Sequence, residues 1–190
     1  MAWLLLLLIL TAAVVVVLIY NRLVGARNAY QNAFAQIGVQ LKRRHDLIPN
    51  LSETAKAYLK HENDTFTQVS EARNQAAALL AAATPENTAA LAQAENLLMQ
   101  ALRAVQVQLE AYPELQAAAN MRQLAEEIAS TENRIAFARQ AYNDAVMEYN
   151  TLIQMFPHNL IAAQTGHGRP VQTLEFEDAA DLAQAPQVSF

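Results

Sequence analysis

The residues that could carry catalysis or bind a metal are few, and their spacing suits neither role. His61-Glu62 begins like the zinc-protease motif H-E-x-x-H, but the third residue after Glu62 is Thr, so the second histidine ligand is missing. Glu126, Glu127 and Glu132 lack the Glu-x-x-His pairing of a di-iron helical bundle. No serine lies in a nucleophile elbow, no glycine-rich phosphate loop is present, and the chain contains no cysteine. We therefore expect no enzyme, no cofactor or metal, and no small-molecule substrate.

The densest group of basic residues is Arg43-Arg44-His45-Asp46. As a site, it would be a basic spot that contacts a partner or a lipid headgroup. As structure, it would be a helix end, with cations at one carboxyl terminus and Asp46 as the cap of the next helix. A straight helix would carry the group roughly 33 Å beyond Tyr20, several Debye lengths away from a membrane surface at that residue. We favour the helix end and keep the four residues as interaction candidates.

The first twenty residues predict a transmembrane helix. Trp3 to Tyr20 is an uncharged run of 18 residues in which Thr11 is the only polar residue. As a helix this run spans roughly 27 Å, close to the thickness of the hydrocarbon core of a bilayer, and its aromatic ends suit the two interfaces. A cleaved signal peptide would need a basic start and a cleavage site, and a buried core helix would show a polar face. The sequence shows neither pattern.

The charges beyond this run predict how the protein is oriented. Five Lys and Arg and no acid lie between residues 21 and 45, and no basic residue precedes the apolar run. The positive-inside rule then places the N-terminus outside and the domain in the cytoplasm, with a domain on the outer (periplasmic) side as the alternative. From Asp46 onward, eight Lys and Arg face eighteen Asp and Glu, which argues against nucleic acid as a partner.

Hydrophobic spacing predicts an all-α fold, in which the apolar helix continues into an antiparallel, coiled-coil-like bundle of about four long helices. A second helix is expected from Asp46 to about Ala82, with Pro49 in its first turn. The alternative is one continuous helix that Pro49 kinks. Thr84-Pro85-Glu86 is typical of a helix start, and this third helix is expected to end near Ala111.

The fourth predicted helix has the most regular pattern in the chain. It is expected to begin at Asn120, with Gln123 completing a capping box, and to end before Pro157. Two heptad series predict its buried face. They are Met121, Ile128, Ile135, Tyr142, Tyr149 and Phe156, and Leu124, Thr131, Ala138, Ala145 and Leu152. The asparagines that follow Tyr142 and Tyr149 are expected to form hydrogen bonds across a helix interface.

The remaining candidates are small residues on the first helix and aromatic residues near the C-terminus. Gly25, Ala26, Ala29 and Ala33 could let this helix approach a copy of itself, or could simply reflect the alanine-rich composition. After residue 163 the periodicity is lost, so 164–190 is expected to be an irregular tail, docked or disordered. Its aromatic interaction candidates are Phe176 and Phe190. Deletion of the chain from Gln172 onward is expected to leave the bundle folded.

Several stretches, in order along residues 21–165, resemble the LemA family. The opening Asn21-Arg22-Leu23-Val24 is one, and the stretch from Val39 to Leu51 is the most specific. Gly38 departs from the pattern because the family tends to carry an acid there, and Gly166-His167-Gly168 departs because an aromatic residue is expected after the first glycine. Further matches are Tyr112-Pro113-Glu114-Leu115, Thr131-Glu132-Asn133-Arg134-Ile135-Ala136, Tyr142-Asn143, Tyr149-Asn150 and Phe156-Pro157.

The resemblance implies a single-pass protein of a bacterial membrane whose N-terminus lies outside and whose helical bundle is cytoplasmic. It implies no reaction, because the family has no established enzymatic activity. Some relatives are linked to internal membrane compartments, and others lie near membrane proteases. We expect segments 1–20 (membrane helix), 21–163 (bundle) and 164–190 (tail). The expected function is that of a scaffold which contacts the lipid bilayer and forms homo-oligomers. The alternative is an adaptor that presents a membrane-protein partner, such as a protease, through its bundle or acidic tail.

Overall fold

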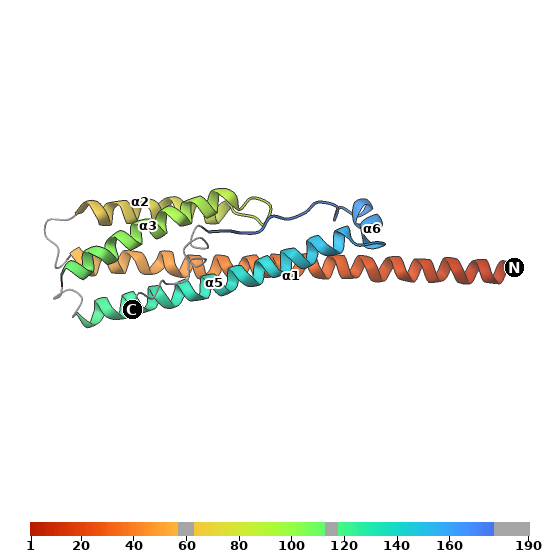
Figure 1. Ribbon diagram of the computed structural model, residues 1–190, viewed down its shortest axis with the longest axis horizontal. Helices are drawn as coiled ribbons and strands as arrows, with labels where there is room; N and C mark the ends of the chain where they lie inside the picture. The colour runs from red at the N-terminus through yellow and green to blue at the C-terminus, as the bar shows by residue number, and fades with distance from the viewer. Residues whose placement is uncertain (57–62, 113–117, 177–190) are drawn as a thin grey trace, which may run out of the picture.

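The longest element is α1 (Ala2–Lys56), a single helix of 55 residues and therefore roughly 80 Å in length. The computed structural model describes residues 1–56, 63–112 and 118–176. Within these ranges α1 is the one helix long and apolar enough to cross a membrane, and its apolar run projects alone beyond the bundle (Figure 1). The side chains of this run are exposed, for example Trp3 at 84% and Leu10 at 58%, except for Ile19, which joins the core. An apolar helix without a protein neighbour is what a lipid-facing segment requires.

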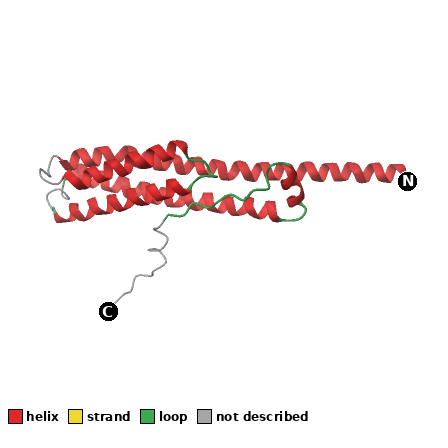
Figure 2. Cartoon of the chain, turned by 90° about the horizontal axis from the view of Figure 1, so that it is seen from above, coloured by secondary structure: helices red, strands yellow, loops and turns green. Residues whose placement is uncertain are grey.

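Four more helices complete the described part of the chain, in which no strand is present. They are α2 (Asn63–Ala82), α3 (Ala89–Ala111), α5 (Ala119–Gln154) and α6 (His158–Gln164). The long helices alternate in direction: α1 packs along α5, and the α2–α3 hairpin lies on α1 (Figures 1 and 2). The short α6 closes the end of the bundle nearest the apolar run, packed against both α1 and α5. The predicted all-α architecture is confirmed.

The predicted helix break at Asp46 is wrong, because α1 continues through Pro49 to Lys56. Proline has no backbone N–H, so the carbonyl of His45, four residues earlier, loses its intrahelical donor. Arg73 of α2 replaces that donor, with its Nε 3.1 Å from the His45 carbonyl oxygen. The helix therefore passes the proline without leaving that carbonyl unpaired.

Two further helix starts differ from the prediction. Pro85 lies in a turn closed by the hydrogen bond from the Asn87 N–H to the Thr84 carbonyl, 2.9 Å long, and α3 begins only at Ala89. In α5 the capping position is Ala118, and no side chain caps the helix. The predicted capping box is therefore absent. The exact residue at which a helix begins is less well determined by sequence pattern than the presence of the helix.

The predicted heptad face of α5 is largely confirmed. Its buried residues include Met121, Thr131, Ile135, Tyr142, Tyr149 and Leu152. Phe156 is the exception at 78% exposed, because α5 ends at Gln154 and the chain turns before it enters α6. The turn carries Phe156 off the buried face that the heptad assigns to it.

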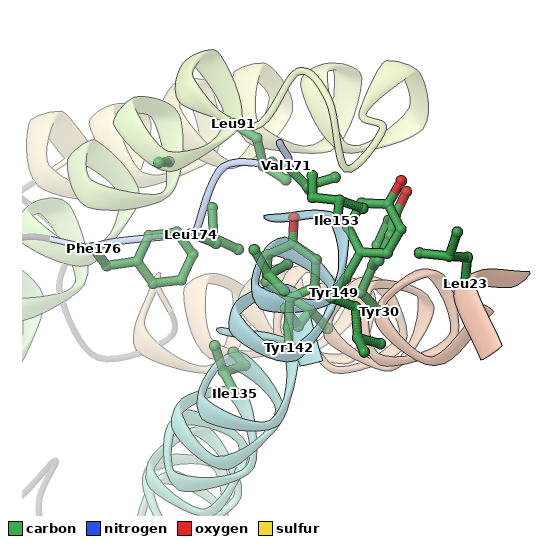
Figure 3. Close-up of a cluster of buried hydrophobic side chains, with 14 of the residues drawn as sticks. Leu23, Tyr30, Leu91, Ile135, Tyr142, Tyr149, Ile153, Val171, Leu174 and Phe176 are labelled. Atoms are coloured by element: carbon green, nitrogen blue, oxygen red, sulfur yellow. The ribbon is translucent and has the colours of Figure 1, made fainter. Parts of the chain in front are cut away.

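The core divides into two clusters along the bundle axis. The cluster nearer the apolar run contains Leu23, Tyr30, Ile37, Leu41, Leu91, Ile135, Tyr142, Tyr149, Val171, Leu174 and Phe176 among others. Figure 3 shows these side chains converging from α1, α3, α5 and the chain after α6. The other cluster, toward the far end of the bundle, contains Ile48, Leu51, Phe66, Val69, Ala94, Leu98, Leu102, Val105 and Met121.

The described part of the tail is docked. After α6 the chain runs back along α5 in an irregular, largely extended path, and Val171, Leu174 and Phe176 are each less than 9% exposed. Because Leu174 and Phe176 belong to the first core cluster, deletion from Gln172 would remove side chains from the core. That the long helices stay folded without them remains a prediction. The tail residue Phe190 lies outside the described residues.

Candidate functional site

A buried ionic cluster lies where the two core clusters meet. Arg44 of α1 is 1% exposed, and its guanidinium binds two carboxylates on two different helices. One is Glu95 of α3, also 1% exposed, which contacts Nη2. The other is Glu132 of α5, whose Oε1 lies 2.6 Å from Nη1. One side chain therefore joins three helices through charge-assisted hydrogen bonds.

His45 and Arg73 extend this cluster. The Nε2 atom of His45 lies 3.0 Å from Glu95 Oε1, so both oxygens of the Glu95 carboxylate have a partner. Arg73 adds α2 through its hydrogen bond to the His45 carbonyl, described above. We call Arg44, His45, Arg73, Glu95 and Glu132 the ionic layer. Four helices contribute to it, and it crosses the bundle at one level.

The position of the ionic layer indicates its structural effect. On α1, Leu41 belongs to one core cluster and Ile48 to the other, and Arg44 lies between them. Sliding α1 by one heptad would place Ile37 or Leu51 opposite Glu95 and leave that carboxylate buried without a cation. Buried charges are tolerated only when they are paired, so the layer fixes how α1 is aligned with α3 and α5.

The structure separates the four predicted residues of the basic group. Arg44 and His45 belong to the ionic layer, whereas Arg43 is exposed. Asp46 forms a surface ion pair with Lys42, 3.0 Å long, and caps no helix. The favoured interpretation of this group as a helix end is therefore wrong, because α1 continues unbroken for ten residues beyond Asp46, to Lys56.

The sequence analysis missed the partners of Arg44, although a signal was present. Leu91, Glu95, Leu98 and Leu102 follow one another at steps of four, three and four, so Glu95 occupies a core position of the α3 stripe. An acid in that position requires a buried cation. Glu132 gives a weaker signal, because it lies beside the α5 stripe and is 33% exposed.

A second arrangement holds the tail, and it comes from the two predicted asparagines. Asn150 accepts from the Val171 N–H at 2.9 Å and donates to the Val171 carbonyl at 2.8 Å. Likewise, Asn143 accepts from the Leu174 N–H at 2.9 Å and donates to the Leu174 carbonyl at 3.2 Å. Seven residues of α-helix rise roughly 10.5 Å, and three residues of extended chain cover about 10 Å, so the two pairs coincide. The asparagines bind the tail and not a neighbouring helix.

Two tyrosines of α5 also form hydrogen bonds to the chain after α6 (Figure 3). The Tyr142 hydroxyl donates to the Gln172 carbonyl at 2.9 Å, and the Tyr149 hydroxyl donates to the His167 carbonyl at 3.0 Å. Burial raises the pKa of both phenols, which therefore stay neutral donors at physiological pH. The His167 ring is 3% exposed, and burial, followed by the nearby Arg27 charge, lowers its pKa below 6.5.

A largely apolar cavity of about 310 Å³ opens between α3 and α5, in the half of the bundle far from the apolar run. Glu132 of the ionic layer reaches its wall, and the arginines Arg103 and Arg122 also line it. The described residues contain no group of three or more His, Asp or Glu side chains placed to hold a metal ion.

The small residues predicted to face a second copy fall into two sets. Ala26 and Ala33 are partly buried and pack against the core cluster of their own bundle. Gly25 and Ala29 are exposed, and a Cβ atom added to Gly25 would meet nothing within 4 Å. Phe176 is 6% exposed, and the Arg139 guanidinium lies 4.8 Å from its ring centroid, so it offers little surface to a partner.

Comparison with known proteins adds a family to this description. Residues 33–190 match the family described as the LemA family. Over 142 residues the chain is 26% identical to Protein LemA of Metamycoplasma hominis, an alignment that covers 75% of this chain. The chain spans 63% of the length of that relative.

Proposed function

The chain belongs to the LemA family, and we propose that it is a non-enzymatic scaffold, anchored in a bacterial inner membrane by α1, that acts by associating with copies of itself. In this proposal the N-terminus lies outside and the bundle is cytoplasmic. The five basic residues between 21 and 45, a stretch of sequence without acids, support that orientation.

The observation that carries the proposal is the outer face of α1 just beyond the apolar run. Its residues follow one another at alternating steps of three and four, and all are exposed: Arg22, Gly25, Ala29, Asn32, Gln36 and Val39. The face is neutral apart from Arg22, and it begins with two small residues where the exposed apolar run ends. Small residues let helix backbones approach closely, and confinement to a membrane raises the effective concentration of copies.

Light scattering of the full-length protein in detergent tests the proposal. Gly25→Leu and Ala29→Leu should shift the assembly toward smaller species without loss of helicity, because larger side chains prevent close approach. Ala136→Leu, at an exposed position of α5, is the matched control and should leave the assembly unchanged. A full-length protein that is monomeric in every detergent would refute the scaffold.

The second candidate is an adaptor for a membrane-protein partner such as a protease, and the cavity between α3 and α5 favours it. Ala125 lines the cavity, so Ala125→Trp should fill it and remove a stoichiometric partner from a pulldown of the solubilised protein. Ala141→Trp, at an exposed position of α5 nine residues beyond Glu132 and on the opposite side of the helix, should retain that partner. Recovery of the same partner with both variants would exclude the cavity as its docking site.

A further inference from the structure

The α5–α6 corner exposes apolar side chains at the end of the bundle nearest the apolar run. Phe156, in the turn between the two helices, is 78% exposed; Leu160 of α6 is 57% and Met155 is 49%. The opposite side of α6 is in the core, where Ala162 is buried and Ile161 packs against the first cluster. The exposed side therefore has no partner among the described residues, and covering it would remove a large apolar area from water.

The level of this corner along α1 follows from ring contacts between the two antiparallel helices. Tyr30 meets Tyr149 with ring centroids 5.1 Å apart. From that level, seven residues toward the membrane lead to Leu23 on α1 and to Phe156 beyond α5, a rise of roughly 10.5 Å. The chain after α6 reaches still further, because the His167 ring contacts Tyr20 at 6.0 Å. Tyr20 ends the apolar run, so the corner, level with Leu23, lies about one helical turn from the end of that run.

Charge separates this end of the bundle from the rest of the acidic chain. The parts of α1, α5, α6 and the following chain that form this end lie within residues 1–45 and 149–174, which contain no Asp or Glu. Arg22 and Arg169 are exposed there. The acids that flank these stretches in sequence are Asp46, Glu148 and Glu175. One acid from another part of the chain, Glu86, acts on Tyr30, whose pKa is raised mainly by burial and further by this carboxylate. Exposed arginines on stretches of chain that lack acids suit an anionic lipid surface.

We infer that the α5–α6 corner is a second membrane contact, in which Phe156 and Leu160 enter the interface of the bilayer that α1 spans. The inference rests on the membrane anchoring in the proposed function. The occupant is a lipid surface, because the corner continues from the lipid-facing run: α6 packs against α1, Ile19 and Ala162 share the first core cluster, and the His167 ring contacts Tyr20. Aromatic and aliphatic side chains beside arginines are typical of such an interface. The bundle then rests on the membrane and does not stand away from it.

Fluorescent labels on single cysteines in the full-length protein test this inference, since the chain has no cysteine of its own. Phe156→Cys and, separately, Leu160→Cys carry an environment-sensitive dye in nanodiscs of phosphatidylcholine and phosphatidylglycerol. Phe137→Cys is the matched control: it lies on α5, is 73% exposed, and is roughly 28 Å farther from the apolar run. Leu10→Cys reports whether α1 spans the bilayer.

We expect blue-shifted emission and quenching by doxyl-labelled lipid at Leu10, Phe156 and Leu160, and neither effect at Phe137. Arg169→Glu should reduce the quenching at Phe156 in anionic nanodiscs, whereas Arg43→Glu, on exposed α1 far from this end, should not. Quenching at Leu10 without quenching at Phe156 and Leu160 would refute the corner contact and leave the anchor intact. No quenching at any position would refute the anchor as well. Shielding of Phe156 that lipid quenchers do not reach and that grows with protein concentration would identify a second copy, and would also overturn the inference.

Discussion

Arg44 occupies a position of α1 that the heptad spacing assigns to an apolar residue. Its neighbours on the same stripe, Leu41 and Ile48, are fully buried, and so is its own guanidinium. Both terminal nitrogens bind a carboxylate, so the cost of removing the charge from water is offset only while those carboxylates stay in place. Residues of this kind specify an arrangement more than they stabilise it.

Arg44→Ala should lower the free energy of unfolding by about 3–5 kcal/mol, because it leaves Glu95 buried without a cation. Urea unfolding of the detergent-solubilised protein, followed by circular dichroism, measures the change. Lys42→Ala removes a surface pair whose side chains are 72% and 56% exposed, and should cost less than about 1 kcal/mol. Equal effects of the two substitutions would show that the ionic layer is not buried.

Arg73 and Pro49 should be energetically coupled through the His45 carbonyl. Arg73→Leu removes the donor that replaces the missing proline N–H, and should cost about 1–3 kcal/mol. In a Pro49→Ala background the restored N–H serves that carbonyl, so the same substitution should cost clearly less. A double-mutant cycle of unfolding free energies measures the coupling. Additive effects would mean that Arg73 has no such role.

His167 should make stability depend on pH below neutrality. Burial, followed by Arg27, lowers its pKa in the folded state below 6.5, so the unfolded chain takes up the proton first as the pH falls. Its contribution is complete above about pH 6.5 and is lost as the pH falls through the folded-state pKa, with a slope of at most about 1.4 kcal/mol per pH unit. Urea unfolding from pH 8 to pH 5 should show a steeper loss for the wild type than for His167→Gln. Identical slopes would contradict this assignment.

The docked tail shows how one element is positioned by another of a different kind. Asn143 and Asn150 present side-chain amides that match the backbone of an extended segment as a neighbouring strand would. The segment in turn places Leu174 and Phe176 in the core, between α5 and the α2–α3 hairpin (Figure 3). α5 therefore provides both the apolar surface on which the tail packs and the two amide side chains that fix the alignment of the tail along the helix.

Replacing both asparagines by alanine should release the tail while the long helices persist. The measurement is amide hydrogen exchange, in which the Val171 and Leu174 N–H groups should lose their protection. Asn133→Ala, at an exposed position of α5, is the control and should leave both amides protected. Unchanged protection in the double variant would show that burial alone holds the segment.

The sequence predicted the helices from periodicity and failed where non-local hydrogen bonds decide. The α5 stripe, including Ile135 and Tyr142, is buried as the heptads require. Pro49 predicted a break or a kink, and its outcome depends on Arg73, 24 residues later, which no local pattern reveals. The basic group at Arg44 was noticed, but its carboxylate partners are 51 and 88 residues away. Residue spacing thus predicts which face of a helix is buried. It does not predict which polar side chains pair in a buried layer, because the pairing depends on how the helices pack against one another.

In the whole molecule, one helix connects the apolar run to the far end of the bundle. The side of the membrane on which that helix emerges therefore decides the location of the entire domain. In sealed cells, a membrane-impermeant thiol reagent should label Ala2→Cys and should not label Asn133→Cys until the membrane is opened. The expectation follows from the basic residues between 21 and 45, which resist translocation. Labelling of Asn133→Cys from outside would instead place the domain in the periplasm.

The two core clusters contain residues from stretches of very different length, so they can form at different times during synthesis of the chain. Every buried residue of the far cluster lies between Ile48 and Met121, so its parts are available once α5 has begun to leave the ribosome. The cluster nearer the apolar run needs residues from Ile19 to Phe176 and cannot close until nearly all of the chain has been made. The end of the bundle beside the apolar run is therefore the last to be completed, although its first helix is the first to emerge.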